Sequence, residues 1–416
     1  MWHMMPQPLE HGSMNFKKLY GLGLKLTILT ACILSCIGLI SASENHQDQS
    51  EKAGQVSEDS QTPQIWDFSF KGSYVNLSSG SRSLEDNAFF SNLQRLRLEL
   101  TGTSEQTLTI KIISDLEAVL GNTLQTSDFS AFKQQTPKGF EIVDTEDIFL
   151  RHRLYRAYLQ YQKDNLQITL GRQRIALGVS KIWSPTDLLN PFTPLSIEKE
   201  ERGGVDALRF EVHSAPLTQT SLTYIPSDKW RDSTLMGRCI TNISEHDFSV
   251  SVGKFKRDYV LGVDVARNFA GAGLRTEGTY TVSPDRPNFF RFTLGGDYTF
   301  KNSFQLVLEY YYNGLFSVKE QPLDMNGTVV PDPLDLARNN LGILGSYDIT
   351  PLLRSNTYLI YAVENRGFFL NPEIAYNVSQ NVDLSFGGMF FYGRKGSLFD
   401  RLQNVYYFRI QWFFGR

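Results

Sequence analysis

Beyond residue 40 the chain contains no long uninterrupted apolar run, and its mean hydropathy is only -0.26. A helix that crosses a bilayer needs roughly 20 consecutive apolar residues, so a helical membrane protein is excluded. Charge of neither sign is in large excess, because 41 lysines and arginines stand against 44 aspartates and glutamates. A surface that binds nucleic acid needs a basic face, and this balance therefore argues against nucleic acid as a partner.

Cysteine and histidine are scarce as well. Two of the three cysteines lie in the apolar N-terminal stretch, which leaves Cys239 alone in the body of the chain, without a disulfide partner or a metal-ligand spacing. The body contains only three histidines (His152, His213 and His246), and no pattern in the sequence marks a partnered serine beside them. No phosphate-binding glycine loop or dinucleotide fingerprint occurs. We therefore predict no enzyme activity, no cofactor and no metal.

The N-terminus has the three parts of a secretory signal. Residues 1–13 are interpreted as an upstream extension, and two lysines follow them before an apolar run over residues 26–40. Small residues come next and then a polar stretch, which is the pattern of a signal-peptidase site. We expect cleavage after Ala42 or Ser43, so that residues 1–43 are the extension and the signal peptide.

Two alternatives remain for this leader. The sequence LTAC ending at Cys32 fits a lipoprotein signal, which would leave Cys32 lipidated, although the apolar residues that continue past it argue against this. A retained membrane anchor is the other alternative, since the apolar run is only slightly shorter than a bilayer span. Residues 44–64 are polar, acidic and nearly free of apolar side chains, so we predict a disordered linker there.

From residue 66 to residue 414 the recurring pattern is a two-residue alternation in segments of about ten residues, which is typical of transmembrane β-strands. Three leucines alternate with charged residues over 95–100, and apolar residues alternate with more polar ones over 406–414. In a bilayer every backbone N–H and C=O must be paired, which strands achieve only by closing into a barrel. The sequence therefore predicts an all-β fold, a transmembrane antiparallel up-and-down β-barrel over residues 65–416, rather than a secreted β-sandwich.

The connections between these segments alternate between short and long. If the first strand runs outward, the short connections are periplasmic turns and the long ones external loops. Counting the segments gives about 18 strands, with 16 as the alternative, because bacterial barrels use even numbers. The long connections are residues 121–147, 178–203, 314–338 and 393–403.

The most distinctive stretch is GRQRIALGVSKIWSPTDLLNPFTPLSIEKEERGGVDALRF, residues 171–210. It resembles the GRQ-type strand followed by W-x-P-T-D and N-P-F in Gram-negative outer-membrane porins of the substrate-selective and alginate-export-like kinds. The aromatic last strand resembles the closing strand that the barrel assembly machinery recognises, although Gly415 and Arg416 follow Phe414 where the family usually ends on phenylalanine.

By this count residues 178–203 form the third external loop, and the resemblance to trimeric porins implies that it folds into the lumen and narrows it. Three prolines stiffen this loop, because each fixes φ and removes a donor. Asp187 and Asn190 are expected to close local turns by bonding nearby backbone.

Charged residues at the end of this loop would then face two arginines on the strand before it. Opposed acidic and basic groups across a constriction produce a transverse field that orders water and favours dipolar or charged solutes. The alternatives are a solvated charge run on the loop and arginines at the outer rim; for the arginines we favour the inward orientation. The candidate pore-lining residues are Arg172, Arg174, Asp187, Glu198, Lys199, Glu200, Glu201 and Arg202.

These features predict a porin that carries small hydrophilic solutes passively across the bacterial outer membrane, with outer-membrane lipid around it. A homotrimer is typical of porins of this size, and a monomeric barrel is the alternative. A polysaccharide exporter or a barrel that anchors surface carbohydrate is the alternative function, and a conductance measurement separates these from an open channel.

Overall fold

The computed structural model describes residues 66–82, 88–104, 107–126, 129, 133, 139–190, 195–198, 203–316, 336–395 and 397–415. The predicted signal peptide over 1–43, the linker over 44–64 and the alternative of a lipidated Cys32 lie outside these residues and stay predictions. Among the described residues no helix is long and apolar enough to cross a membrane.

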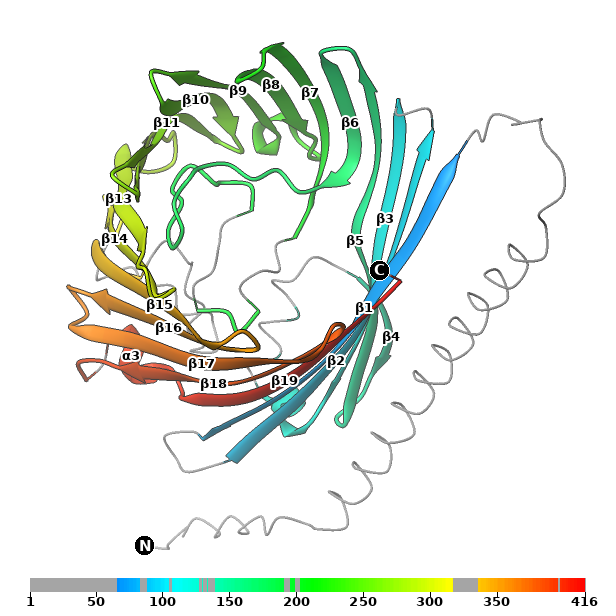
Figure 1. Cartoon of the computed structure of the whole chain (residues 1–416), viewed down its shortest axis with the longest axis vertical. Helices are drawn as coiled ribbons and strands as arrows, with labels where there is room; N and C mark the ends of the chain where they lie inside the picture. The colour runs from blue at the N-terminus through cyan, green and yellow to red at the C-terminus, as the bar shows by residue number, and fades with distance from the viewer. Residues whose placement is uncertain are drawn as a thin grey trace, which may run out of the picture. The chain divides into compact units, whose positions relative to one another are not determined.

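The strands form a closed antiparallel barrel, seen end-on in Figure 1. The sheet closes because the first strand pairs with both the second and the last, with Gly72 opposite Leu98 on one side and opposite Phe414 on the other. The strands are β1 (Asp67–Arg82), β2 (Ala88–Ser104), β3 (Leu108–Leu120), β4 (Phe140–Asp144), β5 (Ile148–Lys163), β6 (Leu166–Gln173), β7 (Val205–Ala215), β8 (Thr218–Ile225), β9 (Thr234–Ile243), β10 (His246–Phe255), β11 (Asp258–Phe269), β12 (Ala272–Val282), β13 (Phe289–Thr299), β14 (Gln305–Asn313), β15 (Asn339–Thr350), β16 (Leu353–Ala362), β17 (Gly367–Ser379), β18 (Val382–Tyr392) and β19 (Val405–Phe414).

One strand is an addition to the barrel wall. β5 is twice as long as β6, and β6 pairs with it only from Ala157 to Lys163. The short β4 pairs with the same edge of β5 nearer its start, from Phe149 to His152. The other 18 strands form the closed barrel, so the predicted count of 18 is confirmed and the alternative of 16 is wrong.

The barrel reverses the usual distribution of polar and apolar side chains. On β2 the charged Arg95 is 4% exposed and points inward, whereas Leu100 on the opposite face is 37% exposed. On β14 Glu309 is 4% exposed while its neighbour Leu308 is 49% exposed. Apolar side chains facing water would cost about 25 cal/mol for each Å². An outward apolar face is therefore stable only in a lipid environment.

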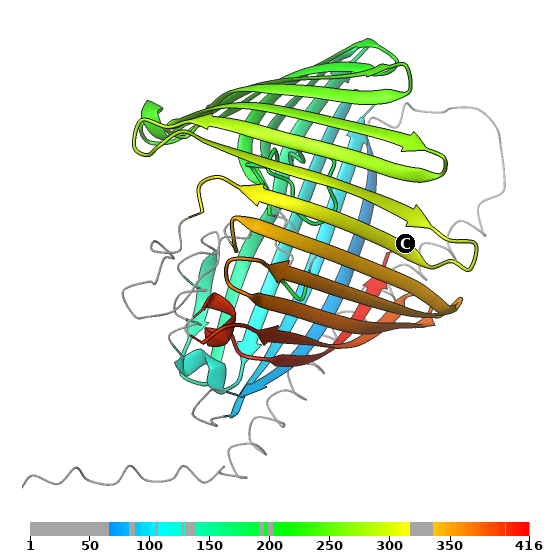
Figure 2. The same ribbon diagram turned by 90° about the vertical axis from the view of Figure 1, so that its left-hand side faces the viewer.

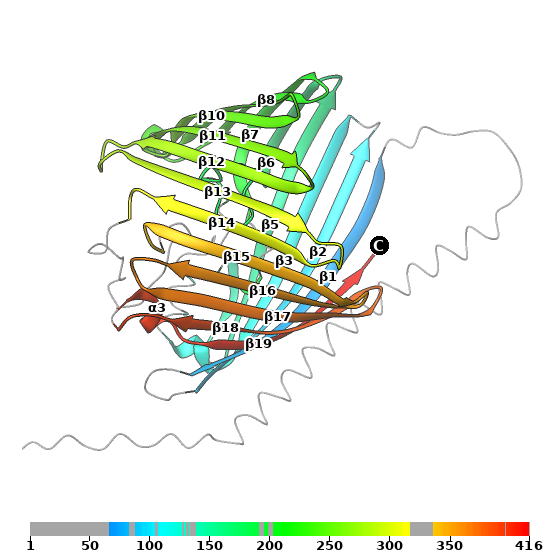
Figure 3. The same ribbon diagram turned by 60° about the vertical axis from the view of Figure 1, so that its left-hand side comes forward.

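The two ends of the barrel differ, and the tilted strands that connect them are visible in Figures 2 and 3. One end, the short-turn end, carries tight turns such as Ser244-Glu245, where both residues have positive φ (51° and 65°). Two residues with positive φ are the geometry of type I′ turns, whose twist matches that of paired strands. At the other end, the long-loop end, the chain leaves β3, β6, β14 and β18 into the longer connections. The short helical pieces η1 (Asn122–Gln125), η2 (Trp230–Asp232) and α3 (Leu398–Arg401) are at this end.

Candidate functional site

The described part of the connection between β6 and β7, residues 174–190 and 195–198, lies inside the ring of strands (Figure 1). We call it the lumen loop. Where it leaves β6, Leu177 packs in a buried cluster with Met236 of β9 on the inner face. The chain then turns at Gly178, which has a φ of 81°, and a Cβ at this position would overlap the carboxylate of Glu277. Only glycine therefore allows the loop to turn this close to the wall.

Glu309 on β14 holds the far part of the lumen loop. Its carboxylate accepts hydrogen bonds from three successive backbone N–H groups, those of Lys181 at 2.5 Å, Ile182 at 2.9 Å and Trp183 at 3.1 Å. The hydroxyl of Thr293 on β13 donates to the carbonyl oxygen of Trp183 at 3.0 Å. Hydrogen bonds to a charged acceptor are roughly twice as strong as neutral ones, so this carboxylate is the main anchor of the loop.

Glu277 on β12 holds the near part of the same loop. Its carboxylate accepts hydrogen bonds from the backbone N–H groups of Val179 and Ser180, both at 3.4 Å. The hydroxyl of Ser184 donates to it at 3.2 Å, and the hydroxyl of Thr186 also donates to it. Two inward carboxylates, on β12 and on β14 with β13 between them, therefore fix residues 179–186 against the barrel wall.

An apolar contact completes the attachment of the loop. The indole of Trp183 stacks on the ring of Tyr311 of β14, with 5.7 Å between ring centroids and 17° between planes. Gly342 on β15 makes room for this indole, since a Cβ there would lie 2.6 Å from the ring. The contact belongs to a buried apolar cluster inside the barrel that also includes Leu336 from the loop before β15 and Phe399 of α3. Part of the lumen is therefore filled by packed side chains.

The turn after Trp183 is built as the sequence predicts. The side chain of Asp187 accepts a hydrogen bond from the backbone N–H of Asn190 at 3.2 Å, and the amide of Asn190 donates to the carbonyl oxygen of Ile175 at 2.9 Å. Asp187 is fully buried, however, with 0% exposure. The proposal that it lines the pore is therefore wrong: it holds the turn and does not reach the water path.

The end of the loop crosses to the opposite wall. Glu198 forms a two-point ion pair with Arg95 of β2, with nitrogen–oxygen distances of 2.6 and 2.9 Å. We expected Glu198 to face Arg172 and Arg174 on the preceding strand, and this pairing is wrong. Because barrel closure places β2 across the lumen from the loop, the acidic group meets an arginine that is distant in the sequence.

Arg95 belongs to a charged region on the inner faces of β2, β3 and β5. Asp115 pairs with Arg97 at 2.6 Å and with Arg153 at 3.0 Å. Glu117 pairs with Arg153 at 2.8 Å and with Arg151 at 2.6 Å. These carboxylates and guanidinium groups alternate along the wall, which keeps the charged side chains in fixed positions beside the loop.

Arg172 lies on the outward face of the barrel. The pairing of β6 with β5 and β7 continues through Gly171 without a register shift, so Arg172 shares the face of Leu170. Its guanidinium pairs with Asp206 of β7, with two nitrogen–oxygen distances of 2.8 Å. The preference for an inward orientation is therefore wrong. An arginine is tolerated on this face because the strand ends here, and the cost of an outward charge falls from about 2–4 kcal/mol at the bilayer centre to near zero at the interface.

The remaining candidates are placed as follows. Arg174 is exposed and lies just beyond the end of β6. Four of the predicted pore-lining residues lie outside the described residues, and their role stays a proposal: Lys199, Glu200, Glu201 and Arg202.

The sequence analysis did not identify Glu277 and Glu309 as residues that hold a loop. Both stand at inward positions of the strand alternation, and this is the only sequence signal they carry. An inward carboxylate that pairs with an arginine on the wall and an inward carboxylate that binds a loop occupy the same kind of position in the strand alternation, so the sequence does not distinguish them.

The histidines add one correction. His152 of β5 does have a serine partner, because its Nε2 lies 2.6 Å from the hydroxyl of Ser114 of β3. Both side chains are on the outward face, and no carboxylate bonded to this histidine is found in the part of the chain described here. In that same part no three potential metal ligands come together.

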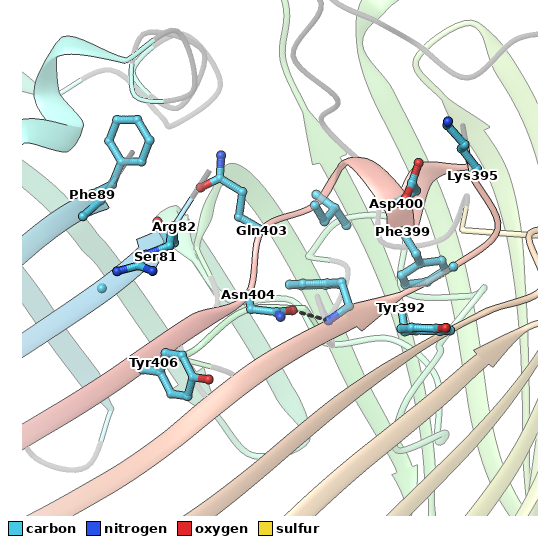
Figure 4. Close-up of a pocket in the computed structure, with 15 residues that line it drawn as sticks. Ser81, Arg82, Phe89, Tyr392, Lys395, Phe399, Asp400, Gln403, Asn404 and Tyr406 are labelled. Atoms are coloured by element: carbon cyan, nitrogen blue, oxygen red, sulfur yellow. Dashed lines mark hydrogen bonds between the residues drawn. The ribbon is translucent and has the colours of Figure 1, made fainter. Parts of the chain in front are cut away.

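A separate hollow of about 1090 Å³ lies at the long-loop ends of β1, β2, β18 and β19, next to α3. Figure 4 shows aromatic side chains such as Tyr392 and Phe399 beside polar ones such as Asn404, whose side-chain oxygen accepts a hydrogen bond from the backbone of Phe391 at 2.9 Å. This hollow is at the mouth of the barrel and does not include the lumen loop.

Comparison with known proteins supports the fold. No family model matches the sequence, and no curated protein does either. Among solved structures, the outer membrane protein OprD from Pseudomonas aeruginosa matches with a TM-score of 0.56 and 10% identity, over 85% of this chain and 95% of OprD. OccAB1 of Acinetobacter baumannii gives a TM-score of 0.56 and 10% identity over 86% of this chain and 99% of OccAB1. OccK8 (OprE) of Pseudomonas aeruginosa gives 0.56 and 8% over 84% and 98%.

These similarities define the class. The protein is an 18-stranded β-barrel of the outer-membrane type, and its fold resembles that of the OprD and Occ proteins. The predicted resemblance to Gram-negative outer-membrane porins is confirmed at the level of the fold.

Proposed function

We propose that this protein is an outer-membrane channel through which small hydrophilic solutes diffuse passively and selectively. The observation that carries the proposal is the lumen loop, which is fixed across the barrel by Glu277 and Glu309 on one wall and by Arg95 on the other. A loop held by this many charged contacts reduces the cross-section of the barrel without relying on a separate plug domain.

The remaining path runs beside the ordered carboxylates and guanidinium groups of β2, β3 and β5. Charged groups held in fixed positions replace part of the hydration of a polar solute, whereas an apolar solute gains nothing from them. We propose that this wall, together with Lys199, Glu200, Glu201 and Arg202, determines which solutes pass. The protein itself makes and breaks no covalent bonds.

The test is a planar-bilayer recording on purified, folded protein, with liposome swelling to follow solute entry. We expect discrete ohmic current steps and a swelling rate that falls steeply as solute mass rises. A folded and inserted barrel that passes neither ions nor small sugars and amino acids would contradict the proposal. In that case the polysaccharide exporter or carbohydrate-anchoring barrel becomes the better account.

The aromatic strand β19, which closes the barrel against β1, is the segment that we propose the barrel assembly machinery recognises. Whether one chain or three make up the functional unit is tested by cross-linking in the native membrane, with a trimer as the expectation for a porin of this size.

A further inference from the structure

The outward face of the barrel contains an apolar groove of about 680 Å³ near the long-loop end of β8 to β12. One row of outward positions crosses these strands in register, and in it Gly237 stands between Leu222 and Val252. Leu261 and Tyr280 continue the row. The groove exists because Gly237 has no side chain where its neighbours have large ones.

Nothing fills the space above Gly237. A Cβ built there would have no atom closer than 3.9 Å, and the backbone φ is not positive. The glycine is therefore required neither by a turn nor by a close approach of the chain, and a larger residue would be accommodated without strain.

Aromatic side chains border the groove on its long-loop side. Trp230 of η2 is 62% exposed and stacks on Tyr224 at 6.3 Å, and Tyr259 is 60% exposed. Lys254 holds this border in place, since its ammonium donates to the carbonyl oxygens of Trp230 at 2.7 Å and of Ser233 at 2.8 Å. Tryptophan and tyrosine gather at the level of lipid headgroups, so the groove lies just inside the bilayer.

Basic side chains lie beyond this border. Lys229, Arg231 and Lys256 are exposed, and among the described residues no carboxylate lies within salt-bridge distance of them, although Lys229 and Arg231 act on Asp232 through space. Most acidic groups nearby are already paired, because Asp232 and Asp285 bind Arg257 and Asp258 binds Arg286. Asp228 is exposed beside Lys229 and is the aspartate of this region without an ion pair among the described residues. The region thus offers an acyl-chain groove with an excess of positive charge next to it.

We propose that this groove binds an acyl chain of a phosphorylated glycolipid of the outer leaflet, the lipid A part of lipopolysaccharide, with its phosphate held by Lys229, Arg231 and Lys256. The apolar row takes the chain, and the basic rim takes the anionic headgroup. An uncharged headgroup would gain nothing from the rim. A second protein copy would need several acidic side chains opposite it, and among the described acidic residues of this rim only Asp228 lies outside an ion pair. The proposal rests on the proposed placement in the outer membrane.

Native mass spectrometry of the delipidated full protein, titrated with lipid A, with dephosphorylated lipid A or with phosphatidylethanolamine, tests the proposal. We expect lipid A alone to bind tightly. Arg231→Glu with Lys256→Glu should weaken its binding on the order of twentyfold or more, since each basic group near a lipid surface contributes about fivefold. The matched control, Lys163→Glu with Lys301→Glu at the short-turn end, should leave binding unchanged.

Gly237→Leu fills the groove and should also weaken lipid A binding while leaving the rim intact. Equal binding of dephosphorylated lipid A, or unchanged lipid A binding by both variants, would overturn the proposal. A change in oligomeric state in Gly237→Leu would instead assign the groove to a second copy. Single-channel recordings on the same samples separate the lipid-binding proposal from the channel proposal. Ohmic current steps without lipid binding would overturn the lipid-binding proposal alone. Lipid binding without conductance would overturn only the proposal of a passive channel.

Discussion

The strongest prediction concerns the carboxylate of Glu309, which binds residues 181–183 of the lumen loop. Glu309→Gln keeps the shape of the side chain but removes its charge and replaces one acceptor oxygen with an NH2 group. That group would face backbone N–H groups of Lys181, Ile182 and Trp183 that now donate to the carboxylate at 2.5–3.1 Å. Two donors would then point at each other.

The magnitude follows from these three bonds. A hydrogen bond to a charged group contributes about 1.5–3 kcal/mol net, and the glutamine retains part of the set. Taking the lower value for the two bonds most weakened gives a loss of about 3 kcal/mol in the closed state of the loop. At about 1.4 kcal/mol for each factor of ten, the population with a released loop should rise roughly 150-fold.

Hydrogen exchange read at the amides of residues 181–183 measures this directly. We expect their exchange to accelerate about 100-fold, while amides of the barrel strands keep their rates, and single-channel conductance to rise. The matched control is Glu211→Gln, another inward carboxylate with 4% exposure, which bonds to Gln167 and Arg209 on the wall. Unchanged exchange in Glu309→Gln, or an equal acceleration in the control, would refute the anchoring argument.

Three further predictions concern other contacts of the loops. Gly342→Leu places a side chain where the indole of Trp183 lies, because a Cβ at this position would be 2.6 Å from the indole ring. Displacement of the indole should shift the tryptophan emission to longer wavelength and raise the conductance. Unchanged emission would show that the position of the indole does not depend on this space. Glu198→Gln removes the charge of the loop residue that pairs with the guanidinium of Arg95, which should destabilise the loop end by about 1.5–3 kcal/mol and speed exchange of amides 195–198; unchanged exchange at these amides would show that the ion pair does not hold the loop end. The hydrogen bond from Arg257 holds the pKa of Asp232 below its usual value of 3.8. The ion pair therefore stabilises η2 at pH values above 3.8, and this stabilisation is lost as the pH falls through the lowered pKa. If the protection of the η2 amides from hydrogen exchange did not change between neutral pH and about pH 2, this prediction would be contradicted.

The sequence alone determined the architecture. Side chains of a strand alternate between faces, and a bilayer demands apolar groups outside and paired backbone throughout, so the alternation over 66–414 leaves a closed barrel as the solution. The positions of short and long connections then gave 18 strands, and Asp187 with Asn190 gave a local turn. Each of these inferences depends on residues close together in the chain.

The contacts of the lumen loop were decided only by the tertiary structure. Glu309 lies more than 120 residues from the backbone groups it binds, and Arg95 lies 103 residues from Glu198. Closure of the barrel brings these groups together across the lumen, and no local pattern records which strand faces which. The outward orientation of Arg172 likewise depends on the unbroken register of β6 with its neighbours, because alternation alone leaves open whether a glycine shifts the face. Short-range periodicity indicates the face of a side chain within an uninterrupted strand, whereas its partner across the barrel is fixed by closure.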